Sequence, residues 1–121
     1  MTYDEIKNIL SQITDPVERL EFVMDIGKSL APIPEGMNPC EIKGCASRVE
    51  IYRDADNNYF GTADSAIVRG LVAIILSMVQ GKSPDEIKGM NLENEIAALD
   101  LQLGAGRMNG VHGIISFLKG L

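Results

Sequence analysis

Capping residues mark where three helices begin along the chain. The three patterns are Thr2 with Glu5, Asp15 with Pro16 and Glu18, and Ser83 with Pro84 and Glu86. Each joins an N-cap side chain to a first-turn proline, to a glutamate three positions after the cap, or to both. The sequence therefore predicts helices that begin at these three points.

The helix predicted over residues 16–30 carries one apolar stripe. Its members are Val17, Leu20, Val23, Met24 and Gly27. Spacings of three and four residues place them on one face of a helix, with acidic residues opposite. We expect this face to pack on a core.

The pattern changes between residues 31 and 63. The stretch APIPEGMNPCEIKGC (31–45) holds three prolines and two glycines, a composition that cannot continue a helix and predicts a loop. After Ala46, the stretch SRVEIYRDADNNYFGTAD (47–64) alternates with period two around Val49 and Ile51, and DADNN supplies turn formers. This predicts an antiparallel hairpin over residues 46–53 and 58–63.

The second half of the chain predicts further helices. The run AIVRGLVAIILSMVQ is apolar almost throughout and predicts a buried helix that Asp64 or Ser65 caps and Gly81 ends. A short helix SPDEIKGM follows, then NLENEIAALDLQL from Asn91, and last RMNGVHGIISFLKGL. With no repeats or linkers in the sequence, we expect a single domain over residues 1–121, an α+β fold with helices packed on a small antiparallel sheet.

Charge and length exclude some partners. Seventeen acidic against eleven basic residues give a net charge of -6, which repels phosphate backbones and anionic lipid, so neither nucleic acid nor a membrane is an expected partner. The longest apolar run falls short of the roughly 20 residues that cross a bilayer. The first residues, MTYDEIKNILSQI, lack the basic and apolar regions of a secretory signal, which favours the cytoplasm.

Metal sites are not favoured by the ligand types present. Cys40 and Cys45 stand five positions apart in the predicted loop, and the single histidine, His112, lies in a separate predicted helix, so four zinc ligands are not available. His112 is interpreted as a packing or surface residue, with a general base as the alternative.

A calcium loop is the other metal reading of this sequence. Asp54, Asp56 and Asn58 resemble the start of one, but Tyr59 and Ser65 stand where such a loop needs glycine and glutamate. The segment is therefore interpreted as a hairpin turn.

Cys45 has the better setting of the two thiols for chemistry. Gly44 before it permits close approach by another protein, and Lys43 and Arg48 bring positive charge that favours a thiolate. These properties leave a reactive and a structural thiol both open.

The segment IKGCASRV resembles the G-C-x-S-x-V segment of the SufE family of sulfur-acceptor proteins. Further segments follow in the family's order: RLEFVMDIGKSLAPIP early in the chain, then DSAIVRGLVAIIL, SPDEI and GRMNGVHGI. The resemblance covers most of the chain and implies a SufE/IscU-like fold.

The resemblance also implies a function and residue roles. Cys45 would accept persulfide sulfur from a cysteine desulfurase and pass it on for iron-sulfur cluster assembly, with the desulfurase stimulated by its removal. Arg107 would stabilise the thiolate or persulfide anion, Asp64 would serve the cysteine loop or cap the following helix, and Ser47 would hydrogen-bond within the loop. No cofactor of its own is expected, because pyridoxal phosphate belongs to the desulfurase. A monomer is expected, partnered by the desulfurase and a downstream iron-sulfur scaffold or other sulfur acceptor.

Two residues depart from the family pattern. Glu50 stands where these proteins commonly carry tryptophan, a change that alters either local packing or the partner surface, and Cys40 is not part of the pattern. A thiol redox protein or sensor that uses Cys40 and Cys45 as a pair is therefore the alternative function. A third hypothesis is a module that regulates a desulfurase without carrying sulfur.

Overall fold

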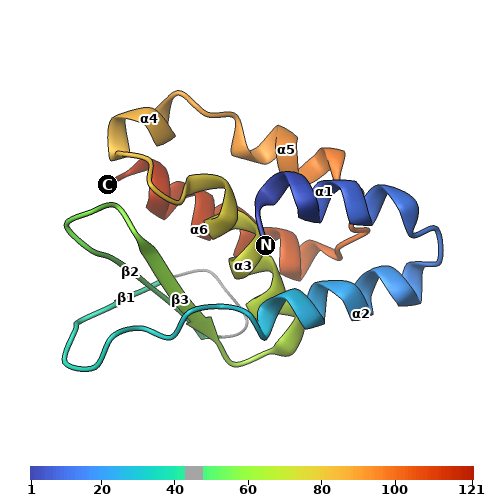
Figure 1. Ribbon diagram of the computed structural model, residues 1–121, viewed down its shortest axis with the longest axis horizontal. Coiled ribbons are helices and arrows are strands. Elements are labelled where there is room, and N and C mark those ends of the chain that lie inside the picture. Colours follow the sequence, from blue (N-terminus) through green and yellow to red (C-terminus); the bar gives the residue numbers. More distant parts are fainter. Residues whose placement is uncertain (43–47) are drawn as a thin grey trace.

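The computed structural model describes residues 1–42 and 48–121, and within these residues it has six α-helices and a three-stranded antiparallel sheet. Figure 1 shows the sheet at one end of the molecule, with the helices stacked beside and above it. The elements in chain order are α1 (Tyr3–Gln12), α2 (Pro16–Gly27), β1 (Cys40–Glu41), β2 (Val49–Arg53), β3 (Tyr59–Ala63), α3 (Ala66–Val79), α4 (Pro84–Lys88), α5 (Leu92–Ala98) and α6 (Ala105–Lys119).

The three predicted helix starts are confirmed, because each capping side chain accepts a backbone N–H. Thr2 Oγ1 accepts from the amide of Glu5 at 3.3 Å, and Asp15 Oδ1 accepts from the amide of Val17 at 3.0 Å. At α4 the capping box is complete, since Ser83 caps the helix and Glu86 bonds back to it. These helices are therefore positioned by local sequence.

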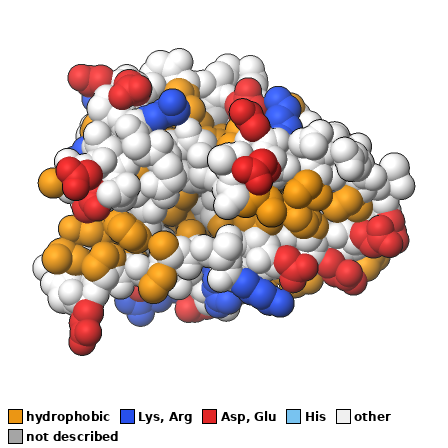
Figure 2. Space-filling model, viewed as in Figure 1, with side chains coloured by type: hydrophobic (Ala, Val, Ile, Leu, Met, Phe, Trp, Pro, Cys, Tyr) orange, Lys and Arg blue, Asp and Glu red, His pale blue; other side chains and the backbone are white. Residues whose placement is uncertain are grey.

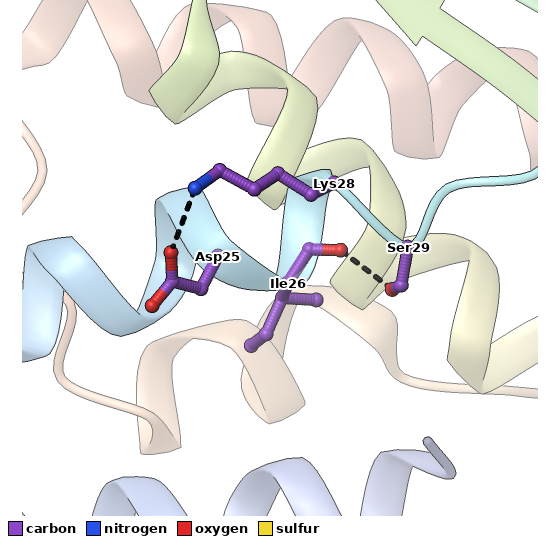
Figure 3. Close-up of polar contacts among 4 residues, drawn as sticks. All are labelled: Asp25, Ile26, Lys28 and Ser29. Atoms are coloured by element: carbon purple, nitrogen blue, oxygen red, sulfur yellow. Dashed lines mark hydrogen bonds and ion pairs between the residues drawn. The ribbon is translucent and has the colours of Figure 1, made fainter.

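Helix α2 ends at Gly27, three residues before the predicted end. The Ser29 hydroxyl donates to the carbonyl of Ile26 at 2.6 Å, and Lys28 Nζ lies 3.3 Å from Asp25 Oδ1 (Figure 3). The carbonyls of the last turn thus accept from residues just beyond the helix, including the amides of Lys28 and Ser29. Of the predicted stripe Val23 is buried, but Val17 is 61% exposed, because it lies in the first turn, away from the closest contact with α3.

Helices α2 and α3 cross at two glycines. A Cβ atom added to Gly70 would lie 2.1 Å from the carbonyl oxygen of Val23, and one added to Gly27 would lie 2.7 Å from the amide nitrogen of Gly70. Side chains at these positions would separate the two backbones, so the glycines set the distance between the helices.

The sheet has the order β1-β2-β3, and its central hairpin is the predicted one. Strand β1 corrects the prediction of a loop over residues 31–45, because Cys40 pairs with Ile51 and Glu41 with Glu50. The strand is only two residues long, and the prolines before it hide it from pattern analysis.

One face of the sheet packs on α3. The residues pointing there from β2 and β3 are buried, namely Val49, Ile51, Tyr59, Gly61 and Ala63. A Cβ at Gly61 would meet Val72 Cγ1 of α3 at 2.8 Å, which confirms the close contact. The opposite face of the sheet, called the outer face below, carries Glu50, Tyr52, Phe60 and Thr62.

The C-terminal helices differ from the prediction at their junction. Helix α5 ends at Ala98, since Asp100 and Gln102 have φ angles of 49° and 54°, which no helix can contain. Arg19 holds this junction through its guanidinium, which donates to the carbonyls of Leu99 and Ile13. No helix in the described part of the chain has the length and apolar character to cross a membrane.

Candidate functional site

The predicted sulfur-accepting residue, Cys45, lies in residues 43–47, outside the described residues, as does Ser47. The structure describes what holds the two ends of this segment. The amide of Ile42 donates to the carbonyl of Val49 at 2.8 Å. The chain that contains Cys45 therefore connects the antiparallel strands β1 and β2.

Asp64 lies beside the start of β2. Its amide donates to the carbonyl of Arg48 at 3.2 Å, which ties it to the residue that follows the Cys45 segment. The N-cap of α3 is Ser65, whose Oγ accepts from the amide of Val68 at 3.4 Å, so the cap role falls to Ser65 and not to Asp64. The Asp64 side chain is exposed and remains a candidate for a role in the loop.

Arg69 is a half-buried residue of this corner that sequence reasoning missed. Its Nε and Nη2 atoms donate to the carbonyl of Ala63 at 3.2 and 3.1 Å. This paired contact braces the turn between β3 and α3, on which Asp64 lies. The signal was present in the sequence, because Arg69 is the one charged residue in the apolar run of α3.

Arg107 lies in the first turn of α6 and is exposed. Among residues 1–42 and 48–121 it has no ion-pair partner. Asp64 lies just before α3, and Arg107 lies in the first turn of α6. These two helices pack on each other. The predicted place of Arg107 beside Cys45 involves a residue outside the described chain and stays a prediction.

The position of Glu50 shows whether a glutamate in place of the family's usual tryptophan changes the packing of the core or the partner surface. Its half-buried carboxylate lies on the outer face, with Oε2 3.6 Å from Arg48 Nη2. It is not part of the core between the sheet and α3, so the change falls on a surface that a partner can contact.

Cys40 and His112 both lie at the surface. Cys40 is an exposed free thiol on β1. His112 Nδ1 lies 3.7 Å from Glu93 Oε2, with both side chains about half exposed. The interpretation of His112 as a surface residue is therefore confirmed.

A groove with a volume of about 520 Å³ runs along the outer face. One wall is the segment that leads from α2 to β1, and the other is the sheet with the start of α3. Its lining residues are Leu30, Pro32, Ile33, Pro34, Glu35, Gly36, Met37, Pro39, Glu50, Gly61, Thr62 and Arg69. The groove thus has an apolar, proline-rich wall facing polar strand residues.

The residues weighed as a calcium loop form a hairpin turn, as predicted. Asp54 Oδ1 accepts from the amides of Asp56 and Asn58, both at 2.9 Å. The side-chain bond from Asn58, followed by these amides, lowers the pKa of Asp54. The described residues contain no cluster of three or more metal-ligating side chains.

Comparison with known proteins gives consistent results. The model of the family SufE, an Fe-S metabolism associated domain, matches residues 4–121. The sulfur acceptor protein CsdE of Escherichia coli is 30% identical over 94% of this chain and 83% of its own length. An uncharacterized SufE-like protein of Rhizobium meliloti is 30% identical over 96% of this chain and 91% of its own length.

A solved structure confirms the fold class. The solution structure of a hypothetical protein from Thermus thermophilus superimposes with a TM-score of 0.76, covering 99% of this chain and 94% of that one. At 12% sequence identity it supports the α+β architecture alone.

Proposed function

Since this chain belongs to the SufE family of Fe-S metabolism associated domains, we propose that it accepts persulfide sulfur from a cysteine desulfurase on Cys45. The observation that carries the proposal is the match over residues 4–121, together with a relative named as a sulfur acceptor protein. The sulfur would then pass to an acceptor that builds iron-sulfur clusters.

The transfer needs a nucleophilic thiolate and no change in overall redox state. The Cys45 thiolate attacks the outer sulfur of the donor persulfide, the donor's S–S bond breaks, and its electron pair leaves with the donor thiolate. Cys45 then carries the outer sulfur as a persulfide. Removal of sulfur from the donor is what would stimulate the desulfurase. Pyridoxal phosphate would act in the desulfurase, where the C–S bond of cysteine breaks.

The described residues support this role by fixing both ends of the segment that holds Cys45. The bonds from Ile42 to Val49 and from Asp64 to Arg48 tie its ends to the sheet, and Arg69 braces the adjoining turn. A thiol carried between anchored strands can be presented to a partner at a defined place.

The first experiment tests the identity of the acceptor. The chain is mixed with a pyridoxal-phosphate cysteine desulfurase from the same organism and with cysteine, and its intact mass is measured. We expect an adduct of about 32 Da, the mass of one sulfur atom, in the wild type and in the matched control Cys40→Ser, and none in Cys45→Ser. An adduct that persists in Cys45→Ser but is lost in Cys40→Ser would contradict the assignment.

The same variants separate a carrier from a regulator. If Cys45→Ser stimulates the desulfurase as fully as the wild type does, the chain is a regulatory module and does not act by carrying sulfur. Loss of both the adduct and the stimulation supports the carrier.

Arg107 is proposed to favour the anionic forms of Cys45. Its charge is not neutralised by any carboxylate in residues 1–42 and 48–121, so it remains available to a thiolate. We expect Arg107→Gln to slow sulfur loading about tenfold at neutral pH and to move the pH of half-maximal loading upward. The reason is that an increase of about one unit in the pKa of the thiol lowers the thiolate fraction about tenfold. Arg107→Lys restores most of the rate. An unchanged pH profile in Arg107→Gln would show that this arginine does not act on the thiol.

A further inference from the structure

Two glutamates lie opposite each other on the outer face. Strand pairing places Glu41 of β1 directly across from Glu50 of β2. Directly paired residues in antiparallel strands have Cβ atoms about 5 Å apart, and like charges there destabilise the sheet. The two carboxylates therefore occupy an arrangement that folding alone does not favour.

The cation beside this pair compensates only in part. Arg48 lies 3.6 Å from Glu50, but the arginine side chain is 60% exposed, so water screens this contact from the cation's side. Glu41 is exposed and has no ion pair with any residue in the two described ranges. The two carboxylates can therefore bind a further positively charged group.

An aromatic pair lies in the next row of the same face. Tyr52 and Phe60 are paired across β2 and β3, with ring centroids 6.1 Å apart and planes inclined by 30°. The Tyr52 hydroxyl donates to Met37 Sδ at 3.3 Å, and Met37 is 47% exposed. Figure 2 shows hydrophobic side chains gathered at the lower left, over the strands and the segment that leads into them. An apolar centre beside charged residues is the composition of a protein-protein contact surface.

We propose that the outer face docks the sulfur-donor protein, and that the pair Glu41 and Glu50 selects a donor with a lysine or arginine at the point of contact. The inference rests on the proposed function and adds the surface and the partner's charge to it. Glu41 and Glu50 stand four residues before and five residues after Cys45 in the sequence. The pair thus lies on the two strands that the segment containing Cys45 connects.

Charge complementarity decides between possible occupants. A second copy of the chain, docked through the same face, would bring glutamates against glutamates in a molecule of net charge -6. A basic side chain from the donor instead relieves the repulsion between the two carboxylates. The pair is thus unfavourable in the free chain and favourable in the complex.

The electrostatic energy of the pair is unfavourable in the free chain and favourable in the complex, and this difference can be measured. In Glu41→Gln and Glu50→Gln, calorimetry with the desulfurase should show binding about three- to tenfold weaker at low salt, and less difference at high salt. Thermal unfolding of the free Glu41→Gln chain should occur about 1 °C higher than in the wild type, because a like-charge contact is removed. Glu21→Gln, the same charge change at an exposed position of α2, is the matched control and should bind as the wild type does.

A second variant tests the aromatic row. Tyr52→Ala should weaken binding about tenfold, since tyrosines at the centre of an interface commonly dominate its free energy. Circular dichroism shows whether the variant is folded. In Glu41→Gln, Glu50→Gln and Tyr52→Ala, the desulfurase concentration that half-loads Cys45 should rise in parallel with the weaker binding, whereas Glu21→Gln should be loaded as the wild type is.

The outcomes separate this inference from the proposed function. If the wild type binds and is loaded, and both glutamate variants bind the desulfurase as tightly as the wild type does, the proposed docking surface is contradicted and the sulfur-acceptor role stands. If the wild type neither binds nor is loaded, both are wrong. Dimers of the free chain that dissociate in Tyr52→Ala would show that the face pairs two copies and would overturn the inference.

Discussion

Asp54 shows how much one side chain can determine locally. Its carboxylate accepts two backbone amides and the side-chain amide of Asn58, and so orders the turn between β2 and β3. Asn57 in this turn has a φ of 60°, a conformation that asparagine adopts more readily than most residues. The sequence DADNN is sufficient to predict this turn.

The lowered pKa of Asp54 predicts a contribution to stability that depends on pH. The hydrogen bonds favour the charged carboxylate in the folded chain, so the pKa lies below its ordinary value of 3.8. The contribution is therefore complete above about pH 3.8 and is lost as the pH falls through the folded-state pKa. Tm measured from pH 6 to pH 2 should fall less steeply in Asp54→Ala than in the wild type. Asp56→Ala, two residues away, is the control and should follow the wild-type curve.

At the scale of elements, the crossing of α2 and α3 depends on backbone contact. Gly27 and Gly70 place the two helices closer than any side chain allows. The following segment, residues 28–39, runs from this crossing to the edge strand β1, along the groove of the outer face. The position of that segment therefore depends on the crossing.

The close crossing of α2 and α3 predicts that a methyl group added at Gly70 strongly lowers the stability of the fold. We expect Gly70→Ala to lower the free energy of unfolding by about 3 kcal/mol, because the added Cβ meets the backbone of Val23, which cannot rotate away. The control is Gly89→Ala at the end of α4, where the nearest atom to an added Cβ lies at an ordinary 3.6 Å. Urea denaturation measures both. Equal stability of the two variants would show that the helices separate without cost.

At the scale of the molecule, one continuous core connects the elements. The cluster of buried apolar residues extends from Ile6 in α1 through Val49 in β2 and Ile75 in α3 to Leu118 in α6. Helix α3 lies at its centre, since it packs on α2, on β3 and on α6. Loss of any one layer exposes apolar surface on α3.

This arrangement predicts a single cooperative unfolding transition, as expected for one domain over residues 1–121. Far-ultraviolet circular dichroism follows the helices. Tyrosine fluorescence, measured in a Tyr3→Phe background so that only Tyr52 of β2 and Tyr59 of β3 contribute, follows the sheet. The two probes should give the same Tm and the same van't Hoff enthalpy. Two separated transitions would show that the sheet and the helices unfold independently.

The sequence by itself determined the features that arise from neighbouring residues. Capping side chains marked the starts of α1, α2 and α4, and the period-two pattern with DADNN marked the hairpin, because these signals act over a few positions. The resemblance in IKGCASRV singled out Cys45, whose role remains a prediction since it lies outside the described residues. The family and the fold class were likewise within reach of the sequence.

Only the tertiary structure decided the features that depend on contacts between different elements of the fold. Strand β1 exists through its pairing with β2, the end of α5 depends on left-handed residues held near Arg19, and Arg69 acts on a carbonyl of the preceding strand. The pairing of Glu41 with Glu50 is of the same kind, because register across strands is set by the packing of the opposite face. Local patterns state which face of an element is apolar, whereas the partner of that face depends on how the whole core closes.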